Sequence, residues 1–157
     1  MRNVLIAVVA AFCLTSILPA DAQNMRVTVW SAFGVSFKVP ANVIIEDDSE
    51  EGYTLSDDTY YINVQILDGE AMNKDNMADE ITQLATEDQL SNLTPVKQFD
   101  LPQFHGVQLQ GTSEGEYYLY NYLMSKDEGG GFFVTVIYKD KADNLPSEII
   151  KSFKLED

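Results

Sequence analysis

The sequence predicts an α+β fold in which antiparallel strands, joined as hairpins, form a sheet covered by two helices. Three observations lead to this prediction. Short runs of alternating apolar and polar residues recur between turn residues, as is typical of half-buried strands. One mid-chain segment changes to the 3.6-residue period of a helix. Near the end of the chain, Pro146 stands where the first turn of a helix tolerates proline.

The first predicted strands precede the mid-chain helix. Residues 35–39 alternate and stop at Pro40. Short strands follow at 43–45 and 53–55, and an acidic turn separates them. Residues 59–67 alternate most clearly, which places two sets of side chains on opposite faces. These sets are Tyr60, Ile62, Val64 and Ile66 on one face, and Tyr61, Asn63 and Gln65 on the other.

The second half of the chain repeats this order. A helix is predicted over residues 74–90, with Asn73 or Asp75 as its cap. Strands return at 96–101 and 105–110, and a glycine-rich loop joins 115–124 to 132–138. A terminal helix is predicted over 144–153. Hairpin-linked strands and two covering helices indicate one α+β domain over residues 23–157.

Residues 1–22 have the order of a secretory signal peptide. Arg2 precedes an apolar run, and the small residues Ala20 and Ala22 stand at the cleavage positions. The run of about 15 residues is shorter than the roughly 20 that span a bilayer. We therefore expect an exported protein that begins at Gln23, has no membrane span, and resides in a bacterial periplasm or outside the cell. The only cysteine, Cys13, lies within the leader, so the exported domain has no disulfide.

The charge of the chain excludes some partners. The sequence has 25 acidic and 10 basic residues, which give a formal net charge of −15. Phosphate backbones and anionic membrane surfaces repel such a protein, so nucleic-acid and membrane binding are disfavoured. The charge favours solubility, and it also favours cations or a basic partner.

Two segments resemble a known superfamily. They are residues 34–37 (Gly-Val-Ser-Phe) with Pro40, and residues 146–153 (Pro-Ser-Glu-Ile-Ile-Lys-Ser-Phe). With the mid-chain helix and late hairpin between them, they resemble the PsbP-like superfamily of PsbP and DcrB-like domains. That superfamily includes a photosystem II extrinsic protein, a Ran-binding protein and a bacterial envelope protein. The resemblance implies an α+β fold and a non-catalytic accessory role, and it carries over no functional residue.

A group of tyrosines is the candidate ligand-binding surface. Tyr118, Tyr120 and Tyr122 share one face of a predicted strand. Tyr61 and Gln108 could lie on neighbouring strands of that face. Aromatic rings edged by amides suit a sugar or a peptide. Alternatively, the tyrosines cover the sheet beneath a helix.

Two acidic turns are the candidate metal site. Asp47 and Asp48 belong to the first turn, and Asp57 and Asp58 to the second. The segment between the turns looks like a hairpin whose ends could approach each other. Clustered carboxylates suit weak calcium binding, although the EF-hand loop pattern is absent. Solvated turns are the alternative.

His105 is the only histidine in the chain. It shares the predicted inward face of its strand with Val107 and Leu109. The sequence has no G-x-S-x-G nucleophile motif and too few histidines and cysteines for an ordinary transition-metal site. A hydrogen-bonded structural histidine is therefore favoured over a hydrolase. The sequence predicts a non-catalytic binding or accessory protein that contacts another envelope protein and needs no cofactor; a sugar or calcium binder is the alternative.

Overall fold

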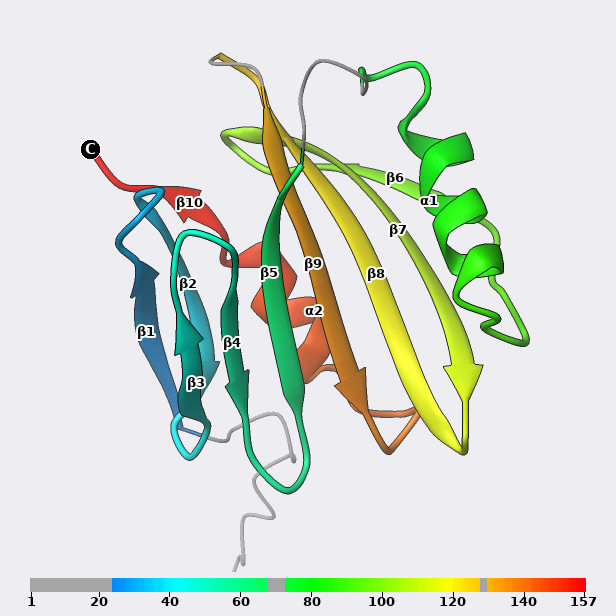
Figure 1. Ribbon diagram of the computed structural model, residues 1–157, viewed down its shortest axis with the longest axis horizontal. Helices are drawn as coiled ribbons and strands as arrows, with labels where there is room; N and C mark the ends of the chain where they lie inside the picture. The colour runs from blue at the N-terminus through cyan, green and yellow to red at the C-terminus, as the bar shows by residue number, and fades with distance from the viewer. Residues whose placement is uncertain (1–23, 68–72, 128–129) are drawn as a thin grey trace, which may run out of the picture.

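The computed structural model describes residues 24–67, 73–127 and 130–157. The predicted signal peptide lies outside these residues. Within them, the chain forms ten strands and two helices (Figure 1). The elements are β1 (Met25–Trp30), β2 (Val35–Pro40), β3 (Ile44–Asp48), β4 (Tyr53–Ser56), β5 (Tyr61–Leu67), α1 (Met77–Glu87), β6 (Lys97–Asp100), β7 (Phe104–Ser113), β8 (Glu116–Ser125), β9 (Gly131–Tyr138), α2 (Leu145–Lys151) and β10 (Lys154–Leu155).

The strands form two sheets. A three-stranded sheet has the order β1-β2-β10, and a seven-stranded sheet has the order β3-β4-β5-β9-β8-β7-β6. Every strand pair is antiparallel. The predicted antiparallel α+β class is therefore confirmed, although strands dominate. The single predicted sheet is wrong, because β2 pairs with β1 and β10 rather than with β3.

The main core lies between the two sheets and α2. Alternation along β2 points Val35, Phe37 and Val39 inward, where all three are almost fully buried. The ring of Phe37 stacks on that of Phe153 just beyond α2, with centroids 4.3 Å apart. The small sheet and α2 thus cover one face of the large sheet together.

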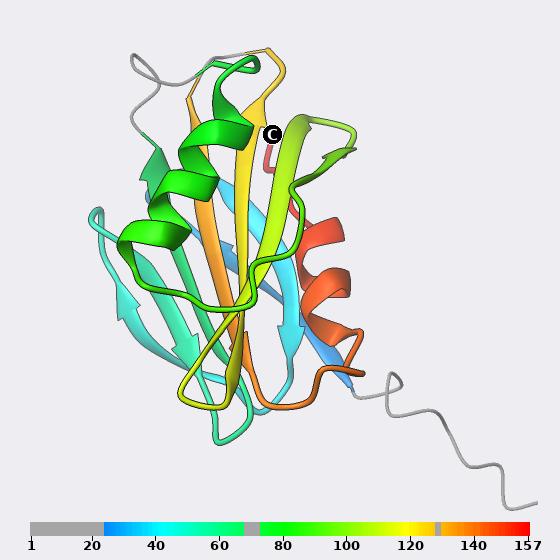
Figure 2. The ribbon, with the colours of Figure 1, turned by 90° about the vertical axis from the view of Figure 1, so that its right-hand side faces the viewer.

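Helix α1 covers the opposite face of the large sheet, so that the two helices lie on either side of it (Figure 2). Met77, Ile81 and Ala85 form the predicted buried stripe. The helix is shorter than predicted and begins after Asn76, not after Asn73 or Asp75. The reason is local: the Oδ1 of Asn73 accepts hydrogen bonds from the N–H groups of Asp75 and Asn76, which forms a turn before the helix.

Helix α2 is also shorter than the predicted segment 144–153. Pro146 lies in its first turn, as predicted. The Oδ1 of Asp143 accepts a hydrogen bond from the N–H of Leu145, which satisfies one donor at the start of the helix. Ile149 and Ile150 are buried, and Phe153 is buried just beyond the last turn.

Candidate functional site

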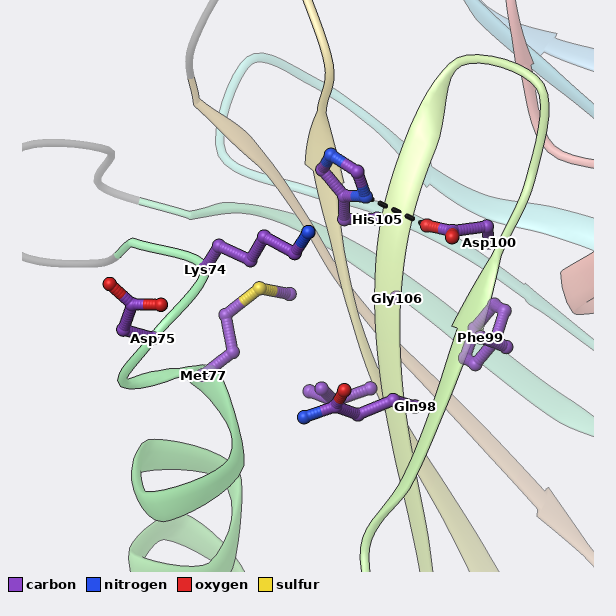
Figure 3. A pocket seen from close by; sticks show the side chains of 9 residues that line it. Lys74, Asp75, Met77, Gln98, Phe99, Asp100, His105 and Gly106 are labelled. Atoms are coloured by element: carbon purple, nitrogen blue, oxygen red, sulfur yellow. Dashed lines mark hydrogen bonds and ion pairs between the residues drawn. The ribbon is translucent and has the colours of Figure 1, made fainter.

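A cavity of about 350 Å³ lies between the segment before α1 and the β6–β7 hairpin (Figure 3). Its lining combines charged, amide and apolar side chains. The lining residues are Lys74, Asp75, Met77, Gln98, Phe99, Asp100, His105, Gly106 and Val107. Among these, only His105 was weighed as a functional residue in the sequence analysis.

The register of β6 and β7 builds the sheet side of this cavity. Gln98 lies opposite Val107, and Asp100 opposite His105, which places all four side chains on the face that α1 covers. Phe99 alternates to the other face and lies across Gly106. A Cβ atom at position 106 would stand 2.4 Å from the Cζ of Phe99. Glycine is therefore required where the phenyl ring crosses β7.

His105 and Asp100 form a directed pair at the rim of the cavity. The Nδ1 of His105 lies 2.7 Å from the Oδ1 of Asp100. An ionised carboxylate only accepts, so Nδ1 is the donor. This hydrogen bond from His105 is the main reason that the pKa of the Asp100 carboxyl is lowered, and the charges of Lys126 and Lys74 act in the same direction. The second ring nitrogen of His105, Nε2, lies on the side of the ring away from Asp100 (Figure 3).

The tyrosines of β8 lie beneath α1. Tyr120 and Tyr122 are each 5% exposed, and the hydroxyl of Tyr120 donates to the Oδ2 of Asp88 at 2.6 Å. Burial is the largest cause of the raised pKa of both hydroxyls, and together with nearby carboxylate charges it brings the pKa of Tyr122 to about 12. Tyr118 is partly exposed. It lies opposite Ile137 of β9, and Ile137 lies opposite the exposed Tyr61 of β5, so the two tyrosines are on the same face of the sheet. The structure therefore places the tyrosines on one face but covers two of them.

The predicted position of Gln108 is wrong. It lies between Val107 and Leu109, so its side chain points to the opposite face of the sheet from Tyr120 and Tyr122. There its Nε2 donates to the Oδ1 of Asn121 at 2.7 Å. Strand alternation alone places Gln108 on the face opposite to Val107 and Leu109, which were assigned to the inward face of the strand.

The two acidic turns do not meet. Asp47 and Asp48 lie on β3, where Asp48 is opposite Tyr53 at the start of β4. Asp57 and Asp58 follow the last residue of β4, so the strand separates the two pairs. The Oδ1 of Asp57 is engaged by the N–H groups of Thr59 and Tyr60. In the described part of the chain, no group of three or more His, Cys, Asp or Glu side chains could hold a metal ion.

The sequence analysis did not predict a surface on β1 and β3, which are edge strands of the small and the large sheet. Arg26 donates to the carbonyl of Val43 at 2.8 Å, and the Nε1 of Trp30 to the carbonyl of Ser49 at 2.7 Å, so β1 runs beside β3. Four aliphatic side chains of these strands are exposed. We call them the edge surface: Val27 (58%), Val29 (40%), Ile44 (65%) and Ile45 (48%).

Acidic side chains border the edge surface. They continue along β3 and through the turn that follows it, and all are exposed: Glu46, Asp47, Asp48, Glu50 and Glu51. The adjacent isoleucines of β3 and the alternation of Val27 and Val29 were the available sequence signals. Their exposure could not be read from sequence, because it depends on which strands end the sheets.

Comparison with known proteins places the chain in a family. Residues 4–142 match the model of the Dihydro-orotase-like family. The chain belongs to this family. No curated protein matches its sequence significantly.

Solved structures of low sequence identity share the fold. A crystal structure of the Saccharomyces cerevisiae Ran-binding protein Mog1p is 8% identical, with a TM-score of 0.62, over 87% of this chain and 97% of that chain. A mutant form of the protein Mog1 is also 8% identical, with a TM-score of 0.60, over 86% and 97% of the two chains. These likenesses show the fold alone. No helix in the described residues is long and apolar enough to cross a membrane.

Proposed function

We propose that this protein is a secreted, non-catalytic binding or accessory protein of the bacterial envelope, and that it contacts a partner protein through the edge surface. The exposure of Val27, Val29, Ile44 and Ile45 on adjacent edge strands is the observation that carries this proposal. Exposed apolar side chains on strands that end their sheets favour association with another chain. The leader-like residues 1–22 support export.

Charge defines the chemistry of the partner. The acidic residues from Glu46 to Glu51 flank the isoleucines of β3, and the whole chain has a net charge of −15. A second copy would bring the same charges to the contact and be repelled. A partner with an apolar contact residue and basic neighbours matches both features. Such charge pairs mainly accelerate and orient the encounter, while buried aliphatic side chains hold the complex.

The fold is compatible with this role. Mog1p, whose structure is similar, is a Ran-binding protein by its name. The same proposal includes membership of the wider PsbP-like superfamily, which contains accessory proteins.

Site-specific photocrosslinking tests the contact. A photoreactive residue replaces Ile44 in the exported protein, and in a matched control it replaces Ile66, which is 42% exposed on β5. We expect position 44 to yield one dominant adduct in intact envelopes and position 66 to yield none. Changing Glu50 and Glu51 to Gln should reduce the yield, because those charges attract the partner. Equal adducts from both positions, or none from position 44, would contradict the proposal.

A hydrolase is the second candidate. The name of the family refers to an enzyme, and the His105–Asp100 pair has the orientation of a base held by a carboxylate. Incubation of the purified protein with dihydroorotate measures this directly. Turnover that His105→Ala abolishes would establish an enzyme; the proposal of a non-catalytic protein expects no turnover above that of the variant.

A further inference from the structure

The cavity beside α1 brings together two nitrogen groups from distant parts of the chain. Lys74 precedes α1, and its side chain extends toward His105 at the start of β7 (Figure 3). Among the described residues, no hydrogen bond or salt bridge engages the Lys74 ammonium group. Lys74 is nevertheless close enough to Asp100 to lower the pKa of that carboxyl. The ammonium group is therefore available to a bound molecule.

Asp100 determines how His105 presents its ring. Because Nδ1 donates to Asp100, Nε2 is the nitrogen left for a ligand. When the imidazole is protonated, both nitrogens donate, so Nε2 offers a charge-assisted hydrogen bond in addition to the one that Nδ1 makes to Asp100. Asp100 is thus a positioning residue for His105.

The rest of the lining limits the shape of a ligand. Met77 and Val107 provide an apolar floor, and the amide of Gln98 provides a donor and an acceptor farther along the cavity. A volume of about 350 Å³ suits a small molecule. We propose that this cavity binds a small organic carboxylate, with its oxygens on Lys74 and His105 and its apolar body over Met77 and Val107.

The acidic character of the chain does not oppose this site. Distant charges are screened beyond about 8 Å at physiological ionic strength. Of the two carboxylates that line the cavity, Asp100 is engaged by His105, and Asp75 points away from His105 (Figure 3). Lys126 adds a further positive charge near Asp100. The site is also separate from the edge surface, because β6 and β3 are opposite edges of the large sheet.

The single histidine makes the test direct. Its imidazole NMR signals are the only ones in the chain. Butyrate is titrated at pH 6 into the protein comprising residues 23–157, and the uncharged butyramide serves as the matched compound. We expect butyrate to move the His105 signals in a saturable way and butyramide to leave them unchanged.

Two lysine variants locate the binding group. Lys74→Met removes the proposed ammonium group, and Lys97→Met removes a charge from the other face of β6. We expect Lys74→Met to weaken butyrate binding roughly tenfold or more and Lys97→Met to leave it unchanged. Backbone spectra of both variants serve as the control for folding.

Several results would overturn the proposal. A shift that does not saturate would exclude a site, and equal binding by Lys74→Met would exclude the assigned donor. Inorganic phosphate that binds as well as butyrate would exclude an organic carboxylate with an apolar body as the ligand class. None of these results depends on whether the edge surface binds a partner, so the two proposals fail separately.

Discussion

The two faces of the seven-stranded sheet are covered in different ways. On one face, the small sheet and α2 bury a continuous apolar core that includes Trp30, Phe37 and Ile149. On the other face, α1 and the segment that follows it, with Leu90, pack on β7 and β8, and the contacts include the tyrosine hydroxyl bonded to Asp88. Only part of this second face is covered, since Tyr61 on β5 remains exposed.

We expect this difference to make the face under the small sheet the more stable one and the face under α1 the more easily opened one. The face with Trp30 and Phe37 excludes water almost completely, so any loss of volume there leaves a cavity. The face under α1 includes polar groups, borders a cavity and is covered by only one helix. Local opening therefore costs less at α1 than in the core between the sheets. The candidate ligand site lies at the more weakly held face.

Trp30→Ala tests the first face and has the largest expected effect. The indole is fully buried, lies next to Tyr53 and Phe132, and donates to the carbonyl of Ser49. We expect the free energy of unfolding to fall by about 3–5 kcal/mol, measured by denaturant titration. Val29→Ala, at an exposed neighbouring position, should change it by less than about 0.5 kcal/mol. Similar losses in both variants would contradict the assigned core.

Ile81→Ala tests the second face. Ile81 is fully buried at the centre of the α1 stripe. We expect a loss of about 2–3 kcal/mol, the lower part of the range for such substitutions, because a single helix can settle toward the sheet. Hydrogen exchange should accelerate in α1 before it does in β2 and β9. Simultaneous acceleration in all three would show that the two faces open together.

Tyr120→Phe removes only the polar contact between α1 and the sheet. The hydroxyl of Tyr120 donates to Asp88, which follows the last residue of α1. Its loss should lower the free energy of unfolding by about 1 kcal/mol, measured by thermal and denaturant unfolding. Tyr61→Phe is the matched control, because that side chain is exposed. If the two variants are equally stable, the hydroxyl contact does not hold the helix.

High pH should lower the free energy of unfolding through Tyr122 on the second face. This is the smallest of the expected effects, and it is absent near neutral pH. Burial, followed by the charges of Glu80 and Asp88, raises the pKa of Tyr122 from 10.0 to about 12. The unfolded chain then loses this proton more easily than the folded one. The contribution to stability is complete below pH 10 and disappears as the pH rises toward 12. Unfolding measured from about pH 8 to about pH 11.5 should show this decline, and Tyr122→Phe should make it shallower.

Local patterns in the sequence predicted local structure well. The alternation of Tyr60, Ile62 and Val64 identified a buried strand face, and the stripe of Met77, Ile81 and Ala85 identified the face of α1. These features depend on the chain's own periodicity. Ile66 was assigned to the same face but is 42% exposed, because alternation does not show where the covering layer ends.

The candidate site depends on long-range pairing, which the sequence patterns did not contain. Lys74 and His105 become neighbours only when α1 lies over β7, and Asp100 reaches His105 through the register of β6 and β7. Likewise, the segment between the two acidic turns was expected to be a hairpin whose ends could approach, but it forms the single strand β4, which keeps the turns apart. Register and layer order decide such contacts, and residue spacing does not specify them.

The pairing of β10 with β2 has a consequence for folding. Leu155 lies opposite Val35, and the N–H of Glu156 donates to the carbonyl of Gly34 at 2.7 Å. The small sheet therefore closes only after almost the whole domain has been synthesised. Contacts so distant along the chain slow folding, because the intervening loop must first be ordered. A nascent chain that ends before Lys154 would therefore still lack the β2–β10 pairing, although β1 and β2 could already pair.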